Sequence, residues 1–203
     1  MIPQNDKEVL LICDLNVFVM AYIFDSSSML SKLPYSFGKV FIHQTVYDEL
    51  SKWQKSGAKK KKFGEGLINS MLEKCGEMVI SEPILAEQEK IKYFRRISLF
   101  EKVLEDDEKS SDTSSSDKTY LALAIKAKAN LATQEKTLRN VSRKVLGEKR
   151  IFDFSDMIID KFHQGQVDKQ KVEDGLKNLA HYEENFAKGT KQNIFKEIEF
   201  SNS

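Results

Sequence analysis

Short apolar runs alternate with amphipathic stretches along most of the chain. The run Val9–Cys13 has the length of a strand, and its unbroken apolar character is typical of a strand buried on both faces of a parallel sheet. Similar runs predict further strands at Lys39–Ile42, Met78–Ile80, Asn130–Thr133 and Arg150–Phe154. Strands that alternate with helices predict a three-layer α/β/α fold with a mostly parallel central sheet.

The helices between these strands are predicted from apolar spacing and from capping residues. Ser114–Ser116 offers an N-cap for one helix, and Gly76 is a candidate C-cap for another. The expected helices cover Val17–Ile23, the stretch from Thr45 onward, Leu67–Lys74, Ile84–Leu104, Asp117–Lys128 and Lys136–Leu146.

Polar segments punctuate this pattern. Ser26–Ser28 and Pro34–Gly38 are expected to be loops, and the acids and serines of Glu105–Ser116 predict a surface loop. After Asp156 the chain is expected to be helical, in pieces. The candidate breaks between these pieces are Gly165, Gly175 and Gly189. We therefore expect a main domain at residues 1–160 and a C-terminal helical extension at residues 161–203.

Composition narrows the class of protein. The 203 residues carry 32 basic and 31 acidic side chains, a net charge of +1, and 40% of them are hydrophobic. This excludes a disordered chain and a polycation that coats nucleic acid by bulk attraction. Cys13, Cys75 and three histidines form no zinc or disulfide spacing, so both thiols are expected to be reduced core residues. Without a basic leader or an apolar stretch near the ~18 residues of a membrane span, we expect a cytoplasmic protein with no membrane partner.

Asp14 directly follows the first predicted strand. It lies at the carboxyl end of the sheet, where functional groups of parallel sheets gather. Its apolar neighbours would make an unpaired charge costly. Asp14 is therefore a candidate site residue, with the alternative that Asp14 or Asn16 only caps the helix that follows.

Glu49 is expected on the inward side of its helix. It shares a face with Val46 and Trp53, whereas its neighbour Asp48 falls on a polar face. An acid that points toward the sheet is a candidate for chemistry. The alternative is a surface pair between Glu49 and Lys52.

Two further acids extend the pattern. Asp117 lies on the buried stripe at the start of a helix, although the helix dipole alone would favour an acid there. Glu135 follows the fourth predicted strand, again at a carboxyl end. Four carboxylates at one rim would repel one another unless a cation neutralised them. Oxygen ligands without His or Cys suit Mg²⁺ or Mn²⁺, which can activate water for attack on a phosphodiester.

Four segments carry these acids in chain order. They are Leu11–Phe18, Val46–Leu50, Asp117 with Leu121 and Ala124, and Leu131–Glu135. Their order and their strand or helix context resemble the acidic motifs of the PIN-domain family, over residues 8–160. The resemblance implies a Mg²⁺- or Mn²⁺-dependent endoribonuclease that cuts single-stranded or structured RNA.

The resemblance also implies roles for individual residues. The catalytic and metal-binding carboxylates would be Asp14 as the central ligand, Glu49 and Asp117 beside it, and Glu135. Asn16 and Thr133 would orient the site through hydrogen bonds. The family usually has an aspartate at the fourth position, so Glu135 places its carboxylate one methylene further out. Asp153 and Asp156 could supply an additional metal ligand, and the simpler alternative is that they mark the start of a helix.

A lysine-rich segment without acids follows Glu49 on what is expected to be the same helix. It is a candidate contact for a phosphate backbone, with a solvated helix end as the alternative. The lysines are Lys52, Lys55, Lys59, Lys60, Lys61 and Lys62. Trp53, on the apolar face, is expected to be a core residue rather than a base-stacking one.

The leading hypothesis is a PIN-like ribonuclease, and the resemblance suggests the toxin of a toxin–antitoxin pair as one role. Its partners would then be RNA and an antitoxin or another protein, with a homodimer left open. A non-catalytic PIN-like module that binds RNA or protein is the alternative. A phosphatase of the haloacid-dehalogenase type is disfavoured, because that family has a second aspartate where Asn16 stands.

Overall fold

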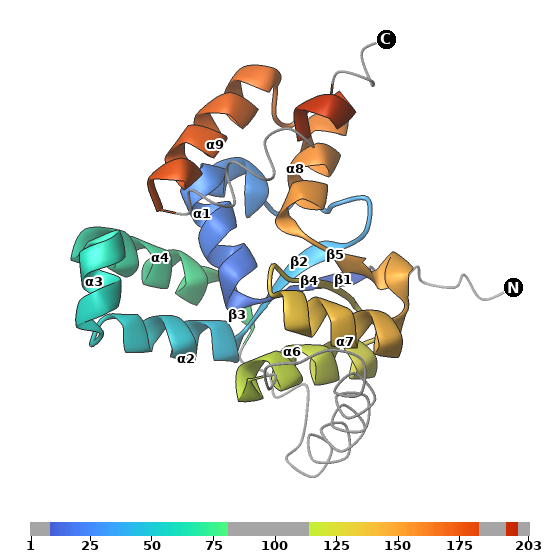
Figure 1. The fold of residues 1–203 in the computed structure, drawn as a ribbon, viewed down its shortest axis with the longest axis horizontal. Helices are drawn as coiled ribbons and strands as arrows, with labels where there is room; N and C mark the ends of the chain where they lie inside the picture. Colours follow the sequence, from blue (N-terminus) through green and yellow to red (C-terminus); the bar gives the residue numbers. More distant parts are fainter. Residues whose placement is uncertain (1–8, 81–113, 183–193, 199–203) are drawn as a thin grey trace, which may run out of the picture.

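One parallel sheet organises the chain. The computed structural model describes residues 9–80, 114–182 and 194–198. Within these ranges, five parallel strands form a single sheet with helices on both faces (Figure 1). The predicted three-layer α/β/α fold with a parallel sheet is confirmed.

The strands are short, and their order places the first one in the centre. They are β1 (Leu10–Cys13), β2 (Lys39–His43), β3 (Val79–Ile80), β4 (Asn130–Ala132) and β5 (Ile151–Phe152). The sheet order is β3-β2-β1-β4-β5, so β1 pairs with β2 on one side and with β4 on the other. The chain first moves outward from β1 to β3 and then crosses back to β4. The direction of winding therefore reverses between β1 and β4, and parallel sheets bind ligands beyond such a switch point.

Helices cover both faces of the sheet. On one face lie α6 (Ser115–Lys126) and α7 (Lys136–Leu146), and on the opposite face lie α1 (Leu15–Met29), α8 (Phe154–His163) and α9 (Lys169–Tyr182) (Figure 1). Right-handed crossovers account for this division, because the two directions of winding send their connecting helices to opposite faces.

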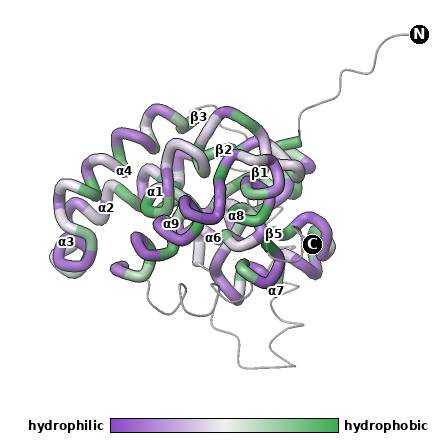
Figure 2. Tube along the Cα trace, turned by 90° about the horizontal axis from the view of Figure 1, so that it is seen from above, coloured by the Kyte–Doolittle hydropathy of each residue, from purple (hydrophilic) through white to green (hydrophobic). Residues whose placement is uncertain are grey.

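Three more helices connect β2 to β3. They are α2 (Gln44–Trp53), α3 (Gly57–Phe63) and α4 (Glu65–Met78), which lie together at one side of the molecule (Figure 1). Figure 2 shows α3 as a mostly hydrophilic segment. A 3₁₀ helix at Glu148–Arg150 and a short helix at 194–198 complete the described elements.

The helix α1 is longer than predicted, because it continues through the serines that were expected to form a loop. Asp25 departs from helical geometry with φ −168° and ψ 96°, which kinks the helix. Its carboxylate then accepts hydrogen bonds from the Ser27 amide at 3.0 Å and the Ser28 hydroxyl at 2.7 Å. Asp25 thus caps the second half of α1, and the predicted loop at Ser26–Ser28 is wrong.

Two glycines that were predicted to end helices lie inside them. Gly76 is within α4, where an added Cβ would lie 3.6 Å from the Tyr47 ring. Gly175 is within α9, where an added Cβ would lie 2.5 Å from the Phe24 ring. Gly175 therefore serves close helix packing, whereas the space at Gly76 would accept an ordinary side-chain contact. A single sequence does not distinguish a glycine inside a helix from one that ends it.

The remaining predicted elements agree with the structure or fall outside it. All five strands and the helices at Asp117–Lys128 and Lys136–Leu146 are present with small shifts of their ends, and Gly165 does separate α8 from α9. The predicted helix at Ile84–Leu104, most of the loop at Glu105–Ser116 and the break at Gly189 lie outside the described residues.

Part of the C-terminal extension packs onto the main core. Val172, Leu176 and Leu179 of α9 are buried and belong to the same apolar cluster as Val17 and Phe24 of α1. The division into a main domain and an extension stays a prediction.

Two expectations about the rest of the molecule can be compared with the structure. Cys13 and Cys75 are both buried and form no disulfide, in agreement with a core role. Among the helices in the described ranges, none is long and apolar enough to cross a membrane.

Two Gly→Ala changes inside helices should have opposite effects on stability, because only one of the two glycines packs against another helix. Gly175→Ala should lower the free energy of unfolding by about 1–3 kcal/mol, because the new methyl group would overlap the buried Phe24 ring. Gly66→Ala in α4 has open space around it and should raise that energy by about 0.5–1 kcal/mol. Urea denaturation of both variants measures the difference, and equal effects would contradict the packing.

Candidate metal centre

Asp14 occupies the switch point at the carboxyl end of β1 and is only 2% exposed. Its amide donates to the carbonyl of Ala132 at 3.1 Å, which extends the pairing of β1 with β4. One carboxylate oxygen accepts a hydrogen bond from the Val17 amide at 2.7 Å, and the other accepts one from the Thr133 hydroxyl at 2.5 Å. Asp14 therefore caps α1, as the alternative interpretation expected, and it also lies at the switch point, where its functional role stays a prediction.

Thr133 links the end of β4 to its neighbours. It is fully buried, and its amide donates to the carbonyl of Phe152 at the end of β5 at 3.0 Å. Its hydroxyl donates to Asp14 and accepts from the Glu135 amide at 3.1 Å. The expected orienting contact of Thr133 is thus present.

Glu49 lies on the inward side of α2, as predicted from its neighbours. It is half-buried, whereas Asp48 is exposed and accepts a hydrogen bond from Gln44 at 2.9 Å. The Glu49 carboxylate accepts a hydrogen bond from the Tyr120 hydroxyl of α6 at 2.8 Å. The contact joins helices on either side of the switch point, and it directs Glu49 toward the candidate site rather than toward Lys52.

Asp117 combines a capping role with a place at the same rim. One of its oxygens accepts hydrogen bonds from the Ser114 hydroxyl at 2.7 Å and the Ser114 amide at 3.2 Å, in a capping box. The other oxygen has no hydrogen-bond donor among the described residues. It is therefore available to a ligand.

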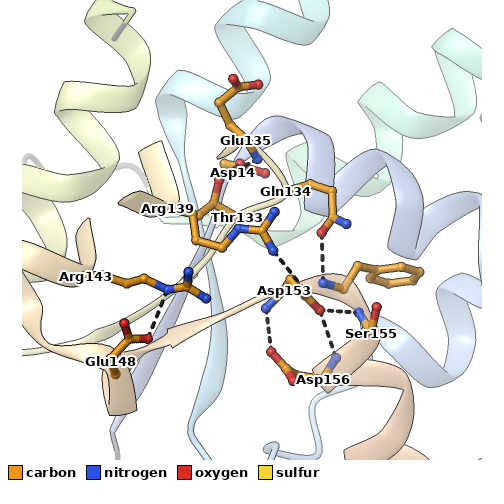
Figure 3. A network of polar contacts seen from close by, with 11 residues as sticks. Asp14, Thr133, Gln134, Glu135, Arg139, Arg143, Glu148, Asp153, Ser155 and Asp156 are labelled. Carbon is orange, nitrogen blue, oxygen red and sulfur yellow. Dashed lines mark hydrogen bonds and ion pairs between the residues drawn. The ribbon is translucent and has the colours of Figure 1, made fainter. Parts of the chain in front are cut away.

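Glu135 is the N-cap residue of α7 but does not use its side chain for capping. Its carboxylate is half-buried and has no hydrogen bond or ion pair to a described residue. In Figure 3 it points away from Arg139 and Asp153. The longer side chain is therefore free to adjust its position at the rim.

The four predicted carboxylates line one cavity of about 230 Å³. They arrive from four separate elements of the fold, at the ends of β1 and β4 and from α2 and α6. Among the described residues the lining consists of Asp14, Leu15, Asn16, Glu49, Trp53, Lys59, Ser114, Asp117, Tyr120 and Glu135. Within this set four acids face one lysine, so this part of the cavity wall is predominantly acidic.

Two of these acids have raised pKa values, chiefly because they are buried. Burial raises the pKa of Asp14 from an ordinary 3.8 to about 7, against the lowering effect of its hydrogen bonds, and repulsion from Asp117 adds to the rise. The pKa of Asp117 is also raised, first by burial and also by repulsion from Glu49. Without a cation, Asp14 is therefore about half protonated near pH 7, and a bound cation would favour its charged form.

The donor set fits a hard divalent cation. The acids supply only oxygen ligands, and the lining residues that the structure describes include no His or Cys, which suits Mg²⁺ or Mn²⁺. Among the described residues, no three His, Cys, Asp or Glu side chains are grouped closely enough to form a ready-made metal cluster. An ion here would keep part of its water shell, as Mg²⁺ usually does in proteins.

Two predicted supporting roles are only partly seen. Asn16 is exposed at the edge of the cavity, and its side chain makes no hydrogen bond to a described residue, so an orienting role through hydrogen bonds is absent from this structure. The lysine-rich segment was predicted to lie on the same helix as Glu49, and this prediction is wrong for most of it. That helix ends at Trp53, and α3 begins anew at Gly57 because the Ser56 hydroxyl accepts a hydrogen bond from the Lys59 amide.

Only one of the six lysines lines the cavity of the acids. Lys59 reaches it and lies 4.1 Å above the Trp53 ring, whereas Lys60 pairs with Glu65 at 3.3 Å. Lys62 lies 5.0 Å from the Phe63 ring centre. The others, Lys52, Lys55 and Lys61, are exposed on α2, after it and on α3.

Asp153 and Asp156 are a helix start rather than additional ligands. Asp153 caps α8 by accepting from the amides of Ser155 and Asp156, and it pairs with Arg139 at 3.0 Å (Figure 3). Asp156 accepts from the Asp153 amide at 2.8 Å. These contacts tie α7 to α8 beneath the rim, and neither acid lines the cavity.

Four lining residues were not predicted for the site, and the first of them is Leu15, which directly follows Asp14. Tyr120 is almost fully buried and was assigned only to an apolar stripe, and Ser114 was considered only as a cap. Trp53 is 8% exposed, so its core assignment is right, yet its ring also reaches the cavity. A tyrosine one turn after a candidate acid carries no signal of its own in one sequence.

The chain matches no known family model, no curated protein and no solved structure. The resemblance to the PIN-domain family therefore stays a prediction.

Burial of Asp14 predicts that this residue destabilises the metal-free protein. Because its folded pKa of about 7 exceeds the ordinary 3.8, the folded state loses stability as pH rises through that window, and the full loss is present above pH 7. In EDTA at pH 8, the free energy of unfolding of Asp14→Asn should exceed that of wild type by up to about 4 kcal/mol. At pH 4 the two free energies should be nearly equal. Denaturation at both pH values measures this, and a pH-independent difference would contradict it.

Proposed function

We propose that the protein is a metal-dependent endoribonuclease that hydrolyses phosphodiester bonds at the cavity of Asp14, Glu49, Asp117 and Glu135. The observation that carries the proposal is the convergence of these carboxylates, from distant parts of the chain, on one cavity at the switch point. The choice of RNA rests on the resemblance to the PIN-domain family.

Each side chain has a distinct part in this mechanism. Asp14 is held rigidly by Val17 and Thr133, and Glu49 is held by Tyr120, so these acids can bind a cation without ordering first. Glu135, which has no described partner, would accept a proton from the attacking water as its oxygen bonds to phosphorus. The bond from phosphorus to the leaving oxygen then breaks, and that oxygen takes a proton from solvent. A divalent ion bound at the carboxylates would supply charge stabilisation for the phosphate and the leaving oxygen.

Lys59 complements the acids at the rim of the cavity. Among the described lining residues it is the one with a cationic side chain, and its ammonium group lies over the Trp53 ring. A cation there attracts a phosphate group to a cavity that would otherwise repel it. The neighbouring lysines of α3 extend this attraction along a bound strand.

A non-catalytic module that binds RNA or protein is the second candidate. It is favoured by the absence, among the described residues, of a ready-made group of three metal-ligating side chains. The same negative cavity would then serve recognition only. A role as a toxin and a partner antitoxin stay predictions.

Glu49 and Asp48 offer a matched test of cleavage. Both acids lie on α2, but only Glu49 lines the cavity. With single-stranded RNA and Mn²⁺, Glu49→Gln should lower the cleavage rate at least about 100-fold, which is the upper end of the losses seen for groups that support a metal site. Asp48→Asn should leave the cleavage rate unchanged. Gel analysis of labelled RNA measures the rates. Equal cleavage by both variants and by Asp14→Asn would assign the activity to a contaminant.

Metal binding can be tested without activity. At an Mn²⁺ concentration of 100 times its dissociation constant, the ion should raise the free energy of unfolding of wild type by about 2.7 kcal/mol, because it binds only the folded state. Asp48→Asn should keep this gain, and Asp14→Asn should lose it. Thermal denaturation with and without Mn²⁺ measures the gain. Its absence from wild type, together with RNA binding and no cleavage, would select the non-catalytic module.

A further inference from the structure

A second cavity adjoins the cavity of the acids. It has a volume of about 220 Å³ and shares Asn16, Trp53 and Lys59 with the first cavity. Its other lining residues are Val19, Met20, Phe63 and Gln134. A single bound molecule can therefore reach from one cavity into the other.

The walls of this side cavity differ in chemistry from those of the first. Val19 and Met20 from α1 form one apolar wall, and the rings of Trp53 and Phe63, which stack with centroids 5.0 Å apart, form another. No acid lines it. The walls suit a flat apolar ring rather than a metal ion or a phosphate.

Two amides give the side cavity a polar edge. Asn16 is exposed at the junction, and its side chain has no hydrogen bond to a described residue. The Gln134 oxygen accepts from the Phe154 amide at 3.1 Å, which fixes this side chain and leaves its amide nitrogen without a described acceptor. Amides that can both donate and accept are suited to the edge of a nucleobase.

We propose that the side cavity is a nucleobase subsite, which holds the base of a nucleotide whose phosphate lies at the cavity of the acids. This inference rests on the proposed function for the position of the phosphate. Lys59 lines both cavities, so its ammonium group stands where the sugar-phosphate link of that nucleotide would pass. The volume is below the roughly 300–1,000 Å³ of sites for drug-sized ligands and suits one ring system rather than a whole nucleotide.

The subsite has a built-in reporter, because Trp53 is the only tryptophan of the chain. Adenosine, uridine and ribose are added to the full-length protein in EDTA, where no cleavage interferes, and tryptophan emission is recorded. The nucleosides should change the emission in a saturable way, and ribose should not. An equal response to ribose, or no saturable response to either nucleoside, overturns the subsite.

A matched pair of variants locates the binding. Phe63 lines the side cavity, whereas Tyr182 stacks on Phe63 at 5.5 Å and lines neither cavity. Phe63→Leu should weaken nucleoside binding at least about fivefold, and Tyr182→Leu should leave it within about twofold of wild type. Met20→Phe fills the cavity from the opposite wall and should also weaken binding, which guards against a folding defect in one variant. Wild-type affinity in both cavity variants overturns the assignment.

Cleavage of RNA that carries one abasic ribose separates the subsite from the proposed function. When the abasic position is moved along the strand, cleavage of one neighbouring bond should fall at least about fivefold. If cleavage depends on Asp14 but no abasic position affects it, the subsite is wrong and the nuclease stands. If nucleosides bind as expected but wild type cleaves no RNA with Mn²⁺, the nuclease is wrong and the base-binding cavity stands.

Discussion

The hydrogen bond from Thr133 to Asp14 is the contact on which the rest of the site depends. It joins the carboxyl ends of the two strands between which the winding of the sheet reverses. Because Asp14 is almost fully buried, its charge has to be held by hydrogen bonds or neutralised, and both of its oxygens are engaged. The cost of this burial falls on folding stability, and the same burial prepares a carboxylate that does not have to lose water when a cation binds. Glu49 and Asp117 then add charge around a fixed centre.

Much of the fold could be predicted from the sequence, because short apolar runs and capping residues are local signals. Asp14 and Glu135 follow predicted strands, and the comparison of Glu49 with Asp48 on one helix identified the inward acid correctly. The break after Trp53 was missed, because a serine N-cap inside a lysine-rich stretch is a weak signal against a continuing helix. The structure of α1 was misjudged for a related reason, since a kink with a new cap resembles a loop in sequence.

Features formed by packing between distant segments could not be predicted. The bond from Tyr120 to Glu49 joins residues from two helices whose relative position depends on the whole sheet. The side cavity lies where α1, α2 and α3 pack incompletely against one another, and the local sequence of one helix does not predict such a gap. The same holds for Gly175, whose place inside a helix follows from the Phe24 ring that approaches it. In each case the deciding quantity is a distance across the fold rather than a property of neighbouring residues.

The central place of β1 has a consequence for protein synthesis. β1 is made early, but one of its two neighbours in the sheet, β4, is made late. While the ribosome is still adding residues before Asn130, β1 has an open edge and Asp14 has no Thr133 to hold it. The four carboxylates therefore cannot come together until Glu135 has left the ribosome. A nascent chain that has not yet released Glu135 from the ribosome therefore cannot form the acidic cavity.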